Sequence, residues 1–84
     1  MQIGLKIRNP LGLHARIASR IVNIVEDHDT DIVLKMGNKV ASAHQIIQII
    51  LLGGRYGDAI IVETQKEEFE SLVIEIVKVL EGVE

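Results

Sequence analysis

The stretch Asn9-Pro10-Leu11-Gly12-Leu13-His14-Ala15-Arg16 decides the fold, because it separates two segments that differ in hydrophobic period. Before it, every second residue between 2 and 8 is apolar, which predicts a strand. After it, apolar residues between 15 and 27 recur every three or four positions, which predicts an amphipathic helix. A proline and a glycine interrupt regular structure between the two. The sequence therefore places His14 where the first helix begins.

The remaining segments continue to alternate between strand and helix patterns. The predicted elements are strands at 2–8, 32–36, 39–43 and 59–64 and helices at 15–27, 45–52 and 65–81. Gly37-Asn38 joins the second and third strands as a hairpin, and Gly53-Gly54 ends the second helix. The fourth strand is apolar on both faces, so we expect it at the centre of the sheet. The order βαββαβα predicts an α+β domain with helices on one sheet face.

Composition limits the classes of protein to which the chain can belong. Its 84 residues suit one domain, 1–84, and 48% of them are hydrophobic, which allows a compact core. The absence of cysteine excludes disulfide and thiolate chemistry. A net charge of −3 and only two aromatic residues argue against nucleic-acid binding. With no signal-peptide pattern and no apolar run longer than Ile49–Leu52, we expect a cytoplasmic protein that does not insert into membranes. We expect it to be a monomer.

His14 is the main candidate for chemistry. A helix start offers unpaired backbone N–H groups and the positive end of the helix dipole, and both favour an anion. A neutral imidazole can also carry a phosphoryl group on a ring nitrogen near neutral pH. We therefore predict that His14 accepts and donates a phosphoryl group, which the amides of Ala15, Arg16 and Ile17 and the Arg16 side chain would bind. The alternative is that His14 only caps the helix and Arg16 is a solvated charge.

The other polar residues indicate no second chemistry. His28 and His44 flank helices and are interpreted as structural. The three histidines have no carboxylate at a metal-ligand spacing, so neither a metal site nor a cofactor is expected. The glycine-rich segment 53–57 follows a helix and lacks the residues of a phosphate-binding P-loop, so we interpret it as a helix end followed by a turn.

The second predicted helix is too apolar to face a single core. Six of the eight residues in 45–52 are Ile or Leu, and at 3.6 residues per turn some of them must point outward. The outward residues either form a docking surface for a partner protein or pack under a neighbouring loop.

Taken together, these segments resemble HPr, the histidine-containing phosphocarrier family of the sugar phosphotransferase system. The resemblance is colinear over essentially the whole chain and is strongest in four segments: Gly12 to Arg16, Gly37 to Ala43, Leu52-Gly53 and Gly57-Asp58. It implies an open-faced β-sandwich, in which three helices cover one face of a four-stranded antiparallel sheet.

The resemblance also implies a function. His14 would be phosphorylated on Nδ1 by phosphorylated enzyme I, which draws on phosphoenolpyruvate, and would pass the group to the A domain of a sugar-specific enzyme II, enzyme IIA. Arg16 would steady the phosphate. A docking surface would lie beside His14 and consist of Ile46, Ile47 and Ile50. Such a chain is a phosphoryl carrier and not an enzyme.

The chain departs from the family pattern at three positions. Ile17 stands where the family usually has proline, and Leu11 stands where a small polar residue is usual. The regulatory serine of many relatives falls at Gln45, which has no hydroxyl group to phosphorylate. Two alternatives therefore remain beside the sugar-transport carrier. One is a paralogue phosphorylated on His14 for regulation, and the other is a small regulatory or assembly domain that binds without covalent chemistry.

Overall fold

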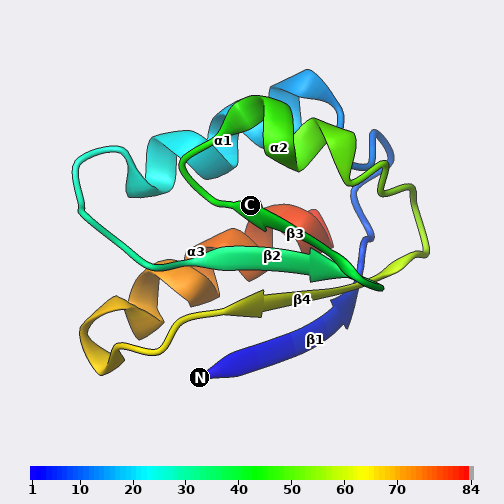
Figure 1. Ribbon diagram of the computed structural model, residues 1–84. Coiled ribbons are helices and arrows are strands. Elements are labelled where there is room, and N and C mark those ends of the chain that lie inside the picture. The colour runs from blue at the N-terminus through cyan, green and yellow to red at the C-terminus, as the bar shows by residue number, and fades with distance from the viewer. Residues whose placement is uncertain (84) are drawn as a thin grey trace.

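The computed structural model describes residues 1–83, and Glu84, the last residue of the predicted domain, lies outside the described residues. Figure 1 shows the elements, which in chain order are β1 (Gln2–Lys6), α1 (Ala15–Val25), β2 (Val33–Met36), β3 (Lys39–Ser42), α2 (Ile46–Leu51), β4 (Ala59–Glu63), the 3₁₀ turn η1 (Glu67–Phe69) and α3 (Glu70–Glu81).

The four strands form one antiparallel sheet in the order β1-β4-β2-β3. The predicted hairpin is confirmed: Met36 pairs with Lys39 and encloses a two-residue turn. The first residue of that turn, Gly37, has a φ of +59°, a conformation that glycine adopts without a Cβ clash. β4 lies between β1 and β2, which confirms the central position predicted from its apolar faces.

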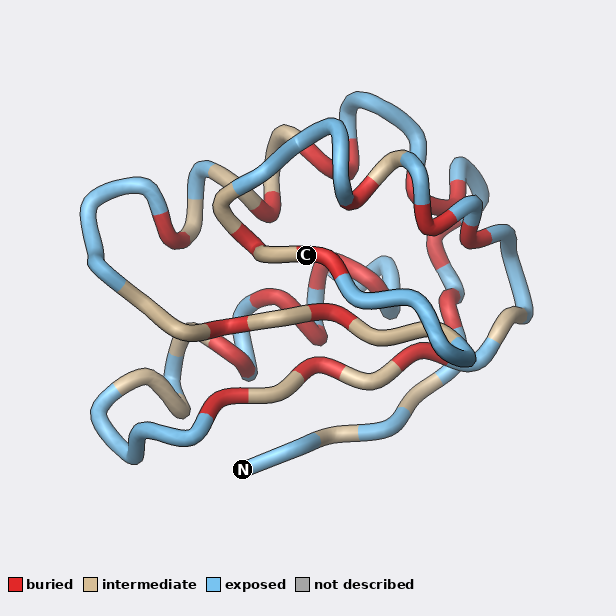
Figure 2. Tube along the Cα trace, in the orientation of Figure 1, coloured by how far each residue is buried: buried red, intermediate tan, exposed pale blue. Residues whose placement is uncertain are grey.

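The three helices cover one face of the sheet and leave the other uncovered (Figure 1). Residues alternate across the strands accordingly, so that Leu34 and Val62 are fully buried while their neighbours are partly exposed (Figure 2). Ile21 of α1 and Ile76 of α3 complete this core from the helical layer and are also fully buried. The predicted α+β architecture, a four-stranded sheet with three helices on one face, is therefore confirmed.

The predicted final helix begins later than its apolar pattern suggests. Residue 65 lies in a bend, residue 66 is extended, and a 3₁₀ turn precedes α3. Two side chains hold this entry segment, one distant in sequence and one local: the Gln65 N–H donates to Asp31 Oδ2 at 2.7 Å, and the Lys66 N–H donates to Thr64 Oγ1 at 3.2 Å. Because these bonds engage the amides outside a helix, the α-helix starts at Glu70 instead of Gln65.

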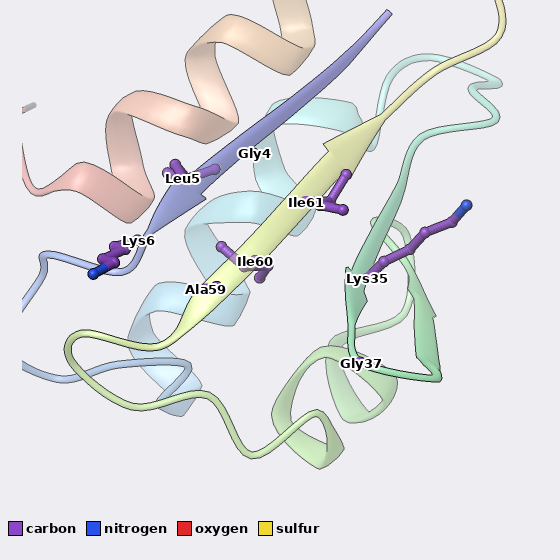
Figure 3. Close-up of a pocket in the computed structure, with 8 residues that line it drawn as sticks. All are labelled: Gly4, Leu5, Lys6, Lys35, Gly37, Ala59, Ile60 and Ile61. Atoms are coloured by element: carbon purple, nitrogen blue, oxygen red, sulfur yellow. The ribbon is translucent and has the colours of Figure 1, made fainter.

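The uncovered sheet face carries a shallow hollow of about 400 Å³ (Figure 3). Its lining includes the small residues Gly4, Gly37 and Ala59, and the side chains of Lys6 and Lys35 extend away from each other at its sides. Lys35 Nζ is held by Glu63 Oε2 at 3.1 Å. Within residues 1–83, no helix has the length and hydrophobicity needed to cross a bilayer.

Candidate functional site

His14 is the N-cap residue of α1, and its side chain is exposed to solvent. Its backbone is extended, with φ −70° and ψ 164°, and its carbonyl accepts the N–H of Ala18 at 2.9 Å. Its ring nitrogen Nδ1 accepts the N–H of Arg16 at 3.4 Å. The imidazole therefore takes the place that a serine or aspartate side chain usually takes at a helix start.

This contact indicates which ring nitrogen faces the helix and which tautomer it favours. Because the Arg16 N–H donates to Nδ1, that nitrogen carries the lone pair, and in the neutral ring the proton is on Nε2. A donor–acceptor distance of 3.4 Å is long for a hydrogen bond of this type, so the lone pair is only weakly engaged. The arrangement leaves a nucleophilic nitrogen exposed and directed toward the first turn of α1.

The first turn of α1 offers backbone donors at the same place. Among residues 1–83, the N–H groups of Ala15 and Ile17 have no hydrogen-bond acceptor, and Arg16 N–H has only the long bond to His14. These are the donors that a helix leaves unpaired at its start. A phosphoryl group on Nδ1 would lie in front of them and in the positive field of the helix dipole.

Arg16 adds a charge beside these donors. Its side chain is exposed and makes no ion pair or hydrogen bond with any other described residue. The guanidinium is thus available for a ligand, and its planar donor pattern matches phosphate oxygens. Residues 9–20 contain no Asp or Glu that would repel a phosphate from this segment.

The loop before His14 is fixed by a close approach of two backbone segments. Leu13 N–H donates to Gly54 O at 3.0 Å, and Gly12 has a φ of +64°. A Cβ at Gly12 would lie only 2.6 Å from Gly54 O. Only glycine fits both the left-handed backbone and the lack of space. The loop after α2 therefore holds the loop that presents His14.

Asn9 shapes the start of the same loop and was not singled out by the sequence analysis. It is buried, its Oδ1 accepts the Leu11 N–H at 3.0 Å, and its carbonyl accepts the Gly12 N–H at 3.2 Å. The Asn-Pro dipeptide, which favours turn initiation, was the available signal.

Exposed apolar residues gather on α2, which packs beside α1. Ile47 is 62% exposed and Leu51 is 69% exposed, whereas Ile49 is fully buried. Ile46 is exposed, but Ile50 is only partly exposed and packs against the core. Leu51, one turn after Ile47, was not among the residues predicted for docking, and the helical spacing of four was the signal that pairs it with Ile47.

The other two histidines lie apart from His14 in the sequence and make different contacts. His44 Nε2 lies 3.0 Å from Thr30 Oγ1 and accepts the Thr30 N–H at 3.4 Å, so it ties the loop after α1 to the start of α2. His28 is exposed after the end of α1. Among the described residues, no three His, Cys, Asp or Glu side chains are grouped to hold a metal ion.

Comparisons with known proteins identify the family that this chain resembles. Residues 1–82 match the family model described as the PTS HPr component phosphorylation site. The chain is 33% identical over 72 residues to the PEP-dependent dihydroxyacetone kinase phosphoryl donor subunit DhaM of Escherichia coli, a match that covers 86% of the chain and 15% of DhaM. It is 30% identical over 70 residues to phosphocarrier protein NPr of Klebsiella oxytoca, which covers 81% of the chain and 78% of NPr.

A solved structure supports the fold independently. HPr-C-His from Thermoanaerobacter tengcongensis superposes with a TM-score of 0.87 at 25% sequence identity. The superposition covers 99% of this chain and 93% of that chain. The arrangement of sheet and helices is therefore shared over the length of both proteins.

Proposed function

This chain belongs to the HPr family of phosphocarrier proteins, and we propose that it carries a phosphoryl group on Nδ1 of His14. The observation that carries the proposal is the position of that nitrogen: it is exposed, bears the ring's lone pair and faces the first turn of α1. The Nδ1 lone pair forms the new P–N bond as the bond from phosphorus to the donor breaks. The electron pair of the broken bond leaves with the donor.

The residues around His14 would hold the group loosely. The amides of Ala15, Arg16 and Ile17 and the Arg16 guanidinium would bind the phosphoryl oxygens, while solvent reaches the group from the other side. A carrier must not stabilise its loaded state so strongly that transfer onward becomes slow. An exposed helix start, in place of an enclosed pocket, is consistent with that requirement.

The proposed donor is phosphorylated enzyme I, and the proposed acceptor is the A domain of a sugar-specific enzyme II. Both partners must reach the same nitrogen, so they would use one overlapping surface. Ile46 and Ile47 on α2, with the adjoining edge of Ile50, supply exposed apolar area for that surface. Leu51 extends the same area by one helical turn.

A second candidate function comes from the relatives. DhaM is named as the phosphoryl donor subunit of a PEP-dependent dihydroxyacetone kinase, and NPr is named as a phosphocarrier without reference to a sugar. The chain would then accept the phosphoryl group on His14 and pass it to a kinase or regulatory partner. The chemistry at His14 is the same, and only the acceptor differs.

The test begins with the intact mass of the chain after incubation with phosphoenolpyruvate and enzyme I. We expect one added phosphoryl group that is lost in acid and is absent from the His14→Ala variant. Transfer to an enzyme IIA, and restored sugar uptake in cells that lack their own carrier, would support the transport role. Charging of His14 without transfer or uptake would support the second candidate. Absence of any charging by a competent enzyme I would leave the non-covalent domain as the remaining explanation.

A further inference from the structure

Two loops form a surface beside His14 that no role described above uses. The loop after β1 and the loop after α2 lie side by side at one end of the molecule (Figure 1). The Ile7 N–H donates to Asp58 O at 2.9 Å, and the Gly57 N–H donates to Ile7 O at 2.7 Å. Further along, a Cβ at Gly12 would lie 3.1 Å from Arg55 Cα. Arg55 therefore stands against the loop that presents His14.

The backbone of Arg55 is fixed while its side chain is free. The Arg55 N–H donates to Asp58 Oδ2 at 2.9 Å, and the Asp58 N–H donates back to Arg55 O at 3.0 Å. Asp58 is the only acidic residue between 53 and 58, and its carboxylate is engaged by this backbone contact. The exposed Arg55 guanidinium has no hydrogen-bond or ion-pair partner among residues 1–83.

Tyr56 and Leu11 give the surface apolar area. Tyr56 is 58% exposed and Leu11 is 49% exposed. The Arg8 guanidinium lies over the Tyr56 ring, 5.8 Å from its centroid, a geometry that orders both side chains through a cation–π contact. Arginine and tyrosine are, with tryptophan, the residue types most enriched among residues that contribute strongly to binding at protein interfaces.

We propose that Arg8, Leu11, Arg55 and Tyr56, the arginine–tyrosine surface, are a second docking element that contacts a carboxylate-bearing patch on the phosphoryl-exchange partner. This inference rests on the proposed function, because it assigns the surface to the protein that charges His14. The arginine–tyrosine surface would extend the contact with the partner from the apolar face of α2 to the loop that follows that helix. Leu51 near the end of α2 and Gly53-Gly54 connect the two areas along the chain.

The charge distribution identifies the partner surface as acidic. The chain has a net charge of −3, yet in the described part of the chain no carboxylate pairs with Arg8, Arg16 or Arg55. Four acidic residues between 26 and 31 lie instead in the loop at the opposite end of the molecule (Figure 1). An acidic partner would be repelled by that end and attracted to the arginines. It would therefore approach the chain at the end that carries His14.

The test compares two variants that change the net charge equally. Arg55→Glu reverses the charge of the arginine–tyrosine surface, and Lys66→Glu reverses an exposed charge before η1, at the other end of β4. Each is assayed as a substrate of a phosphoenolpyruvate-charged enzyme I over a range of carrier concentrations. We expect Arg55→Glu to raise KM about tenfold over wild type and to leave kcat within about twofold, since opposed charges at an interface act mainly on association. We expect Lys66→Glu to leave KM within about twofold of the wild-type value. Added salt should reduce the difference between the two variants.

Four outcomes would overturn the inference. Equal KM values for Arg55→Glu and Lys66→Glu, with both chains folded by circular dichroism, would show that Arg55 does not contact the partner. A lower kcat or faster loss of the phosphoryl group at unchanged KM would place Arg55 on the phosphate instead of on the partner. If the wild-type chain itself is never charged, the proposed function fails and the docking inference falls with it. Normal charging of wild type and Arg55→Glu alike would overturn the docking inference alone.

Discussion

The backbone N–H of Arg16 donates to Nδ1 of His14 at 3.4 Å, so the proposed phosphoryl-accepting nitrogen and the start of α1 face each other. One residue thus serves as helix cap and as candidate nucleophile. When Nδ1 takes a phosphoryl group, the cap contact is lost, but the phosphoryl oxygens can accept the amides that the ring releases. Loading and unloading would then exchange one acceptor for another at the same helix start, without a change in fold.

The Arg16 side chain should matter for transfer and little for stability. Arg16→Ala keeps the backbone N–H that faces His14 but removes the guanidinium. We expect phosphoryl transfer to slow by about tenfold or more, because a hydrogen bond to a charged group contributes about 1.5–3 kcal/mol. The unfolding free energy should stay within about 0.5 kcal/mol of wild type, as is usual for an exposed site. Single-turnover transfer rates and urea unfolding measure the two quantities, and an unchanged rate would contradict the assignment.

A charge at Ile47 should weaken partner binding and leave the fold intact. Ile47→Asp places a carboxylate on the exposed face of α2, where it costs little in the free protein but would be desolvated in a complex. We expect the KM for charging by enzyme I to rise while the melting temperature changes by only a few degrees.

Ile74→Asp is the matched control for Ile47→Asp, because Ile74 is 41% exposed on α3, a helix outside the proposed docking surface. It should leave KM unchanged. A large drop in melting temperature for Ile47→Asp would show that the residue supports the core, and equal KM values for both variants would remove α2 from the docking surface.

Gly12 should be the least replaceable glycine in the loops. Gly12→Ala meets both a left-handed backbone and Gly54 O at 2.6 Å. Gly37→Ala meets a similar backbone, with a φ of +59°, but no atom within 4 Å. The control should lose about 1–2 kcal/mol of stability, the usual cost of a left-handed residue, and Gly12→Ala should lose more. Denaturant unfolding of both variants measures the difference, and equal losses would contradict the close approach.

The local elements follow from sequence pattern, whereas the contacts that hold the site do not. Alternation and helical periodicity suffice for β2, β3, α1 and α2, because each buries one face against the same core. The hydrogen bond from Leu13 N–H to Gly54 O joins segments 41 residues apart, and no sequence pattern around either residue predicts it. Likewise, the late start of α3 depends on Asp31, which is distant in sequence because the β2–β3 hairpin and α2 come between Asp31 and Gln65.

Part of the candidate site was likewise predictable from the sequence, and part was not. The position of His14 at a helix start was predictable, because a glycine and a change of period mark it. Which ring nitrogen faces α1 was not predictable from the residues alone, since that depends on the side-chain rotamer. Among the apolar residues of α2, composition showed that some must be exposed but did not distinguish Leu51, which is 69% exposed, from Ile50, which packs against the core.

Asp31 should make stability depend on acid pH. The Thr64 hydroxyl and then the Gln65 N–H donate to its carboxylate and hold its pKa below the usual 3.8, although partial burial acts in the opposite direction. A carboxyl whose pKa is lower in the folded than in the unfolded state stabilises the fold above the unfolded value. That stability is lost as pH falls through the folded pKa.

Asp31→Asn tests this dependence, because it removes the titrating group and keeps the shape. At pH values well above 3.8, the difference in unfolding free energy between wild type and Asp31→Asn should be constant. As the pH falls below 3.8, this difference should shrink. Urea unfolding from pH 2 to pH 7 measures it. A difference that stays constant to the lowest pH would show that the carboxyl titrates normally in the folded chain.

The most direct test of the central claim is the imidazole nitrogen NMR spectrum of the ¹⁵N-labelled chain before and after charging by enzyme I and phosphoenolpyruvate. We predict that the Nδ1 resonance of His14 shifts and shows coupling to phosphorus, that Nε2 shows no direct bond to phosphorus, and that His28 and His44 do not change. Phosphorus on Nε2, on another histidine, or on no imidazole at all would contradict the account.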